Sequence, residues 1–225
     1  YQAGSSGRGQ AFAARHAECV FVSSQTKEGL RKLVAEVRES VAREGRNPRD
    51  IKFFMGVTAV VGRTQAEARE KHAEYLRYAN PEAGLAHYAS STGIDFSRYG
   101  AQEPIRYVKN NAIESAVKNL TVTRTDRTVT DLLADMALGG RYPALVGSAA
   151  QVADELESWV AETDIDGFNL ARTVTPECYG DFIDLVIPEL QSRGSYKTAY
   201  AEGPLREKLF GAGRAELPVE HVGRR

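Results

Sequence analysis

The sequence predicts an α/β fold in which strands and helices alternate and the strands pair in parallel. Short apolar runs of strand length are separated by amphipathic helical segments with brief connections, which is the pattern of parallel βα units. The composition, 42% hydrophobic and 26% charged over 225 residues, is that of a globular chain. The formal net charge of −1 gives no bulk attraction to nucleic acid or anionic membrane, and no apolar run approaches the ~18 residues of a transmembrane helix.

The chain opens with a strand end, a loop and a first helix. Residues 1–3 are typical of a strand already under way, so we expect further chain upstream of Tyr1. Residues 4–9, with the sequence GSSGRG, predict a loop. A short helix is expected over residues 10–17, and the compact apolar run at 18–23 predicts a strand buried on both faces.

The next segment predicts an amphipathic helix and a second strand. Thr26 is the expected N-cap, and Gly45 with Pro48 ends the helix. One face of this helix carries an apolar stripe made of Leu30, Leu33, Val34, Val37 and Val41. Residues 51–61 predict the strand, and the capping box of Thr64 and Glu67 begins a helix that runs to about Ala79.

Residues 82–130 interrupt this regular order. Short helices are expected over residues 82–91 and 111–120, but the stretch is too long for an ordinary connection between βα units. We therefore expect an elaboration over one end of the sheet, the end that usually carries the ligand in barrels and doubly wound sheets.

The βα order resumes after residue 130. A helix over 131–138 and an extended stretch over 142–147 precede a second capping box, formed by Ser148 and Gln151. The helix that follows is expected to carry Val152, Leu156, Trp159 and Val160 on one face.

The last strand is predicted at residues 166–171, where Gly167 allows close backbone approach. A helix is expected over 179–193 with a kink at Pro188, and Gly194 is its predicted C′ residue. A short helical piece is expected near residues 205–210, and residues 211–225 are expected to form a flexible tail.

Histidine and cysteine spacing offers no metal site and no catalytic triad. Cys19 and Cys178 are expected to be buried thiols in a reducing compartment. His16 favours a capping or packing role, whereas a substrate-facing role stays open for His87 in the elaborated region. Asn169 favours packing, although a position in a barrel mouth is the alternative.

The loop at residues 4–9 is the most informative candidate site. Backbone N–H groups, two hydroxyls and a helix N-terminus together suit a phosphate, because the helix dipole favours negative charge there. The competing interpretation is an ordinary βα turn built from small residues.

Five sequence segments, in this order, resemble one enzyme family. They are Gln2–Ser6 with Phe12–Glu18, Val146–Ser148 with Gln151–Asp154, Asp166–Leu170, Pro188–Gln191 with Arg193-Gly194, and Leu205–Leu209. The resemblance is to the C-terminal half of the bacterial luciferase-like, flavin-dependent monooxygenases. The similar branch includes nitrilotriacetate, dibenzothiophene sulfone and long-chain alkane monooxygenases.

The resemblance implies a TIM (β/α)8 barrel, of which residues 1–210 would supply strands five to eight with a long insertion at about 82–130. It also implies reduced FMN as cofactor, obtained from a separate NAD(P)H:flavin reductase, and O2 as co-substrate. A flavin C4a-(hydro)peroxide would then place one oxygen atom in a small organic substrate. We expect the protein to be cytoplasmic and to form a homo-oligomer.

Residue by residue, Ser5 and Ser6 match the pair that holds the FMN phosphate in this family, and Gly4 lets the backbone come close. An Arg8–phosphate contact is not inherited from the family pattern. The family's other flavin and substrate contacts belong to its N-terminal half, so the resemblance assigns no catalytic residue here. The alternative function is a non-catalytic α/β fragment or pseudo-enzyme that acts through self-association.

Overall fold

A computed structural model describes residues 1–3, 6–103, 128–138 and 142–224. The chain divides into two compact units. The first unit contains Tyr1–Gly56, Ala153–Asn169 and Ile183–Arg225, and the second contains Val57–Val152 and Leu170–Phe182. Strand β3 (Lys52–Gly62) contributes residues to both units. Among the described residues, no helix is long and apolar enough to cross a membrane.

The first unit is built on parallel strands. Strand β1 (Gln2–Ala3) pairs with β2 (Cys19–Val22), which pairs with the first half of β3, both in parallel. The predicted parallel pairing of the first two buried strands is therefore confirmed. Strand β5 (Gly167–Ala171) also pairs with β3, and the Asp166 N–H donates to the Phe53 carbonyl at 2.9 Å.

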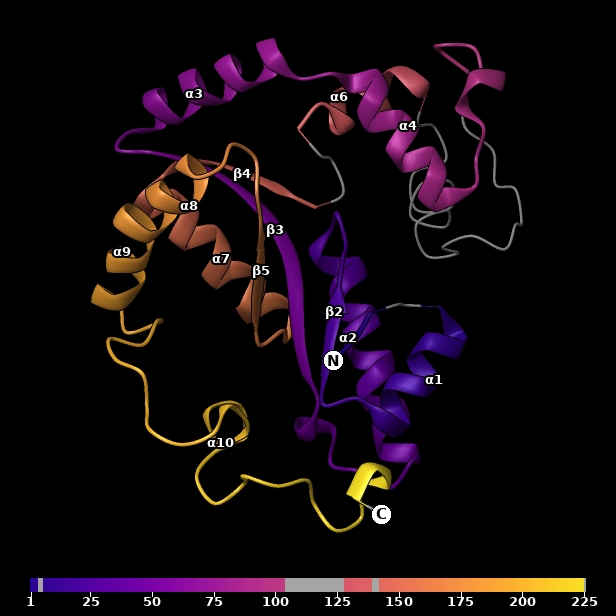
Figure 1. The fold of residues 1–225 in the computed structure, drawn as a ribbon, viewed down its shortest axis with the longest axis vertical. Coiled ribbons are helices and arrows are strands. Elements are labelled where there is room, and N and C mark those ends of the chain that lie inside the picture. The colour runs from indigo at the N-terminus through magenta and orange to yellow at the C-terminus, as the bar shows by residue number, and fades with distance from the viewer. Residues whose placement is uncertain (4–5, 104–127, 139–141, 225) are drawn as a thin grey trace. The chain divides into compact units, whose positions relative to one another are not determined.

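Helices α1 (Gly7–His16) and α2 (Lys27–Arg43) pack against each other in this unit (Figure 1). Helix α2 begins at Thr26 as predicted, since the Thr26 hydroxyl accepts the Gly29 N–H at 3.2 Å. The predicted apolar stripe is buried except for Leu33, which is half-buried. The core of the unit comprises Ala13, Ala14, Val20, Val22, Leu30, Val34, Val37, Val41, Phe53 and Met55.

Helix α7 (Ala149–Thr163) begins at the predicted capping box. The Ser148 N–H donates to Gln151 Oε1 at 3.0 Å, and the Gln151 N–H donates to Ser148 Oγ at 3.4 Å. Trp159 is buried, but the next residue, Val160, is 40% exposed, so the predicted apolar face is only partly buried. Neighbouring helical residues point about 100° apart, which puts Val160 on the rim of the apolar face.

The predicted helix over residues 179–193 is divided into three pieces. Helix α8 (Glu177–Asp181) continues through a π-helical turn (Phe182–Val186) into α9 (Ile187–Ser192). Pro188 has no N–H and its ring crowds the carbonyl four residues earlier, so the wider π turn takes up the misfit. The predicted kink is therefore present as a π-helical turn before Pro188. Gly194 adopts the left-handed φ of +75° expected at C′.

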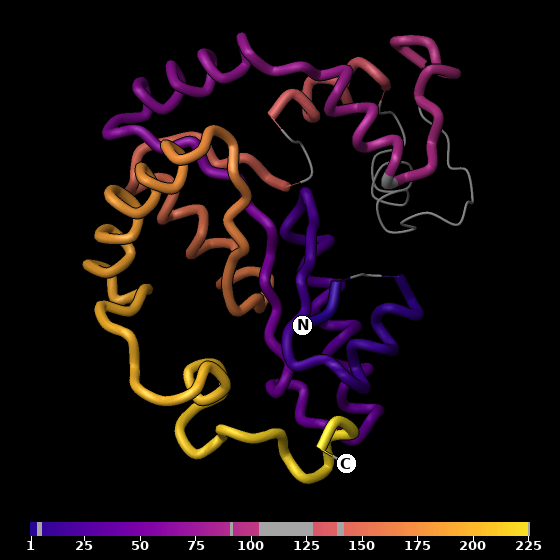
Figure 2. Tube along the Cα trace, in the orientation of Figure 1, coloured from indigo at the N-terminus to yellow at the C-terminus, as the bar shows by residue number. Residues whose placement is uncertain are grey.

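The C-terminal part of the first unit contains one short helix and a 3-10 turn. Helix α10 (Leu205–Phe210) lies where it was predicted, and a 3-10 turn (Val222–Arg224) contacts α1. Figure 2 shows the path of this segment from α10 to the end of α1. Arg214 forms an ion pair with Asp50 at 2.7 Å.

The second unit pairs the later half of β3 with β4 (Ala144–Ser148) in parallel. Helix α3 (Gln65–Tyr78) begins at Thr64, whose hydroxyl accepts the Glu67 N–H at 3.1 Å. The Glu67 carboxylate accepts the N–H of Arg63 rather than that of Thr64, so the predicted capping box is shifted by one residue on that side.

The elaboration after α3 has a small core of its own. Helices α4 (Pro81–Thr92) and α6 (Val129–Met136) pack together and join a 3-10 turn (Phe96–Arg98). The buried members of this core are Ile94, Phe96, Val129 and Leu132. The helix predicted over residues 111–120 lies outside the described residues.

Candidate functional site

Ser6 stands at the junction between β1 and α1. It is the N-cap of α1, with an extended backbone (φ −65°, ψ 157°) that directs the chain into the helix. The other two residues predicted for this site, Gly4 and Ser5, lie outside the described residues. Because β1 is parallel to its neighbours, Ser6 follows the carboxyl end of a strand, which is where barrels and open α/β sheets place their ligands.

The Ser6 hydroxyl is used as an acceptor and keeps its proton available. Its Oγ accepts the Gly9 N–H at 3.2 Å, and its carbonyl accepts the Gln10 N–H at 2.8 Å. A serine hydroxyl has one O–H donor besides its acceptor lone pairs. Ser6 is therefore able to cap the helix and to donate a hydrogen bond to an anion at the same time.

The first turn of α1 suits a phosphate group. The first N–H groups of a helix have no intrahelical acceptor, and the N-terminus carries the positive end of the helix dipole. No acidic residue stands in this turn, and both Gly7 and Arg8 are exposed. A Cβ added to Gly7 would meet no described atom within 4 Å, so there is space beside the first residue of the helix.

The other end of α1 is bound by Arg46, a residue that the sequence analysis did not select. Its guanidinium donates to the carbonyls of Ala14 at 2.6 Å and Ala17 at 2.7 Å, with a longer bond to Ala13 at 3.4 Å. These carbonyls close the last turn of α1, where the helix itself supplies too few donors. No local pattern marks this contact, because Arg46 is about 30 positions away from its acceptors along the chain.

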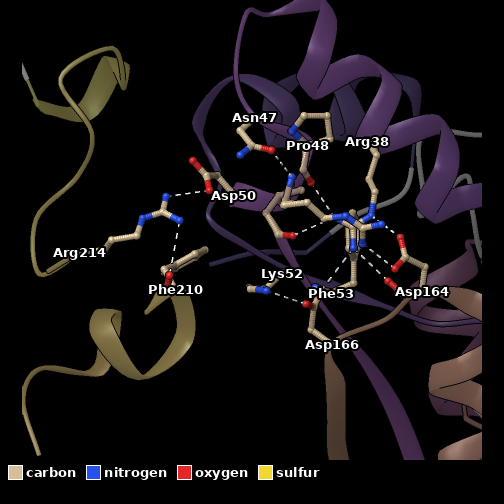
Figure 3. A network of polar contacts seen from close by, with 12 residues as sticks. Arg38, Asn47, Pro48, Asp50, Lys52, Phe53, Asp164, Asp166, Phe210 and Arg214 are labelled. Atoms are coloured by element: carbon tan, nitrogen blue, oxygen red, sulfur yellow. Dashed lines mark hydrogen bonds and ion pairs between the residues drawn. The ribbon is translucent and has the colours of Figure 1, made fainter. Parts of the chain in front are cut away.

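A separate polar network lies at the opposite end of β3 and β5 (Figure 3). Arg38 donates to Asp164 at 2.7 Å and to the Pro48 carbonyl at 2.6 Å, while Lys52 pairs with Asp166 at 2.8 Å. Burial alone would raise the pKa of Asp164, but the hydrogen bond and charge of Arg49, with those of Arg38, hold this pKa below its usual value. Because it precedes the strands, this network stabilises the sheet and is not part of the Ser6 site.

The remaining sequence candidates are His16, His87, Asn169 and the two cysteines. His16 stands at the far end of α1, where its ring lies 4.6 Å from that of Phe12, in agreement with the predicted packing role. His87 is exposed on α4 in the second unit, and Asn169 is exposed on β5, so the packing favoured for Asn169 is wrong. Cys19 and Cys178 are buried free thiols, as predicted.

Comparison with known proteins decides the family. The family model described as luciferase-like monooxygenase matches residues 1–166. The chain belongs to the luciferase-like monooxygenase family. This confirms the resemblance drawn from the sequence segments, and it confirms the α/β class, because the family fold is a TIM barrel.

Relatives of this luciferase-like chain include enzymes with different substrates. It is 42% identical to dimethyl-sulfide monooxygenase of Hyphomicrobium sulfonivorans, over 98% of this chain and 46% of the relative. It is 41% identical to long-chain alkane monooxygenase of Geobacillus thermodenitrificans, over 100% of this chain and 47% of the relative. Among solved structures, a riboflavin lyase with modified FMN and riboflavin matches with a TM-score of 0.89 and 34% identity, over 99% of this chain and 49% of that chain.

The chain spans about half the length of the curated relatives it matches. The assignment of this half to barrel strands five to eight stays a prediction.

Proposed function

We propose that the protein is a luciferase-like monooxygenase that uses reduced FMN and holds the FMN phosphate at the N-terminus of α1. The observation that carries this proposal is the first turn of α1, which is capped by Ser6 at the carboxyl end of β1, has exposed Gly7 and Arg8, and is free of acidic residues. A phosphate dianion suits this position because it meets several N–H donors and the positive end of the helix dipole. Membership of the luciferase-like monooxygenase family supports FMN as the phosphate-bearing ligand.

The described residues have defined roles in this proposal. In this proposal the Ser6 O–H and the N–H groups of Gly7 and Arg8 bind the phosphate. Ser5 is the second hydroxyl of the proposed pair, and Gly4 lets the backbone come close. Reduced flavin supplies the electrons with which one atom of O2 enters the organic substrate while the other leaves as water. The protein's part in this chemistry is to fix the flavin and to exclude water from it.

The proposal includes partners outside this chain. An NAD(P)H:flavin reductase supplies reduced FMN, and the substrate is a small organic molecule. We also propose a homo-oligomer. Light scattering of the natural full-length protein should give a mass above that of the monomer across micromolar concentrations, and a monomeric mass would contradict this part.

Two substitutions at Ser6 separate phosphate binding from helix capping. Ser6→Asp keeps a good N-cap but adds a negative charge beside the phosphate, whereas Ser6→Ala removes both the cap and the hydroxyl donor. We expect Ser6→Asp to leave the free energy of unfolding within about 0.5 kcal/mol of wild type, and Ser6→Ala to lower it by about 1 kcal/mol. Both should weaken reduced-FMN binding by at least about tenfold, since a hydrogen bond to a charged group is worth about 1.5–3 kcal/mol.

Riboflavin is the control ligand because it has no phosphate. Its affinity, measured by equilibrium dialysis of reduced flavin without oxygen, should change less than about twofold in Ser6→Asp. If FMN and riboflavin lose affinity equally, the phosphate role of Ser6 is wrong. If Ser6→Asp binds FMN as wild type does, the phosphate does not lie at this helix.

A further inference from the structure

We infer that Arg46 is a positioning residue for the FMN phosphate, because it fixes the helix whose first turn binds that phosphate. The inference rests on the proposed function. It adds a residue about ten helical positions away from the phosphate, at the opposite end of α1, that touches neither flavin nor substrate.

Arg46 donates hydrogen bonds to the carbonyls of buried residues. Ala13 and Ala14 are each 1% exposed and Ala17 is 5% exposed, so these three residues are shielded from water, although Arg15 and His16 beside them are exposed. Arg46 Nη1 donates to Ala14 and Arg46 Nη2 to Ala17 at 2.6 and 2.7 Å, which are short, charge-assisted bonds. Without the guanidinium, carbonyls that the helix leaves unpaired would be buried without a donor.

Arg46 is itself held by the end of α2. Gly45 adopts a φ of +74°, and this left-handed turn lets the Arg46 N–H donate to the Val41 carbonyl at 3.1 Å. Helix α2 is fixed in the core by Leu30, Val34 and Val41, each at most 1% exposed. The guanidinium therefore connects α1 to the most firmly packed helix of the unit.

Helix α1 depends on this connection because the side chains that it buries are small. Its buried residues are Ala13 and Ala14, which bring one methyl group each to the core. Small apolar contacts resist sliding of a helix along its axis poorly, whereas two short hydrogen bonds at one end fix its position. A shift that breaks the Arg46 bonds would move the Ser6 end of α1 by the same amount.

The effect of Arg46 on the phosphate is mechanical, not electrostatic. The ten residues of α1 span about 15 Å at a rise of 1.5 Å per residue. Charges separated by this distance are largely screened at physiological ionic strength, where the Debye length is about 8 Å. Removal of the Arg46 charge therefore changes phosphate binding little by electrostatics. The larger effect on phosphate binding comes from the loss of the position of α1.

The test compares Arg46→Met with Arg206→Met in the natural full-length protein. Arg206 is a matched control, since it donates to Glu18 at 2.9 and 2.8 Å in the same unit but touches no α1 carbonyl. The readout is the ratio of the riboflavin and FMN dissociation constants, measured for reduced flavins by equilibrium dialysis without oxygen. Circular dichroism and urea unfolding are recorded for each variant.

We expect Arg46→Met to weaken FMN binding about tenfold and riboflavin binding less than about twofold, as for a misplaced binding group. Arg46→Lys should restore most of the FMN affinity, because an ammonium still donates to carbonyls. Arg206→Met should lower stability without changing the ratio. If Arg46→Met does not fold, Arg46→Gln replaces it, since the amide still donates to one carbonyl, and the same ratio decides.

The outcomes separate this inference from the proposed function. A wild-type protein that binds FMN no better than riboflavin would overturn the phosphate site and Arg46 with it. A wild type that prefers FMN, with the preference unchanged in Arg46→Met, would overturn only the role of Arg46. An equal loss of preference in Arg46→Met and Arg206→Met would show a general loss of structure and would also overturn that role.

Discussion

His221 is 5% exposed in the last part of the described chain, and the Gly223 N–H donates to its Nδ1 at 3.0 Å. Its proton must then lie on Nε2, which has no hydrogen-bond partner among the described residues. Burial lowers the pKa of His221, and the charge of Arg46 lowers it further, against the opposing pull of the Glu18 carboxylate. The neutral imidazole is therefore the form that the folded protein accommodates.

This burial predicts an acid-sensitive stability. Since the folded-state pKa lies below the ordinary value of 6.5, the unfolded chain binds a proton first as pH falls, and the free energy of unfolding decreases below about pH 6.5. We expect His221→Gln to lose less stability than wild type between pH 7.5 and pH 5.5 (about one unit either side of the ordinary pKa). Urea unfolding at a series of pH values measures this, and identical pH slopes for the two proteins would contradict it.

Sequence reasoning reached Ser6 but not Arg46 or His221. Ser6 belongs to a local pattern, a strand end followed by Gly and Ser and then a helix, and local hydrogen bonds decide its role. The contacts of Arg46 join positions about 30 residues apart, and His221 is buried against groups from distant segments. No periodicity or spacing encodes such contacts, so only the folded structure identifies them.

At the scale of elements, α3 and α8 are joined by two polar contacts. Lys71 pairs with Asp181 at 2.6 Å, and the Tyr75 hydroxyl donates to Glu177 at 2.8 Å. The residues on each helix are four apart, so one face of α3 meets one face of α8. Burial, together with the hydrogen bond to the Glu177 carboxylate, raises the pKa of Tyr75, which keeps the phenol protonated and able to donate.

A double-mutant cycle measures the Lys71–Asp181 contact. We expect Lys71→Met and Asp181→Asn to show a coupling free energy of about 1 kcal/mol in urea unfolding, because both side chains are only 20% and 23% exposed. The control is the pair Arg98–Asp95 in the same unit, which is 82% and 55% exposed and should give a smaller coupling. A coupling at Lys71 no larger than that of the control would show that the contact does not hold the two helices together.

Three helix starts were predictable because a cap is encoded in three or four neighbouring residues. Thr26, Thr64 and Ser148 all begin helices where the sequence indicates. The start of α1 was predicted wrongly, because this helix begins at Gly7, inside the segment 4–9 that was expected to be a loop. The helix type inside the segment 177–192 was not predictable, because a kink expected at Pro188 does not reveal a π turn before it. The exposure of Val160 depends on which elements pack beside α7, and the sequence of α7 alone does not determine that.

For the whole molecule, the proposal predicts oxygen transfer by the full-length protein. With NAD(P)H, FMN and a flavin reductase, it should consume O2 and place one labelled atom from 18O2 in the product. Relatives act on dimethyl sulfide and on long-chain alkanes, so a volatile sulfide and an alkane are the first substrates to test. Mass spectrometry of the product decides, and a label derived from water would contradict a monooxygenase.

The position of the FMN phosphate is the central claim, and a crystal structure of the full-length protein with FMN tests it most directly. We predict that phosphate oxygens lie within about 3.2 Å of Ser6 Oγ and of the Gly7 or Arg8 backbone nitrogen, the range of hydrogen bonds. Many barrels instead bind phosphate after their seventh and eighth strands. A phosphate bound beyond β3 or β5, with the first turn of α1 empty, would contradict the account.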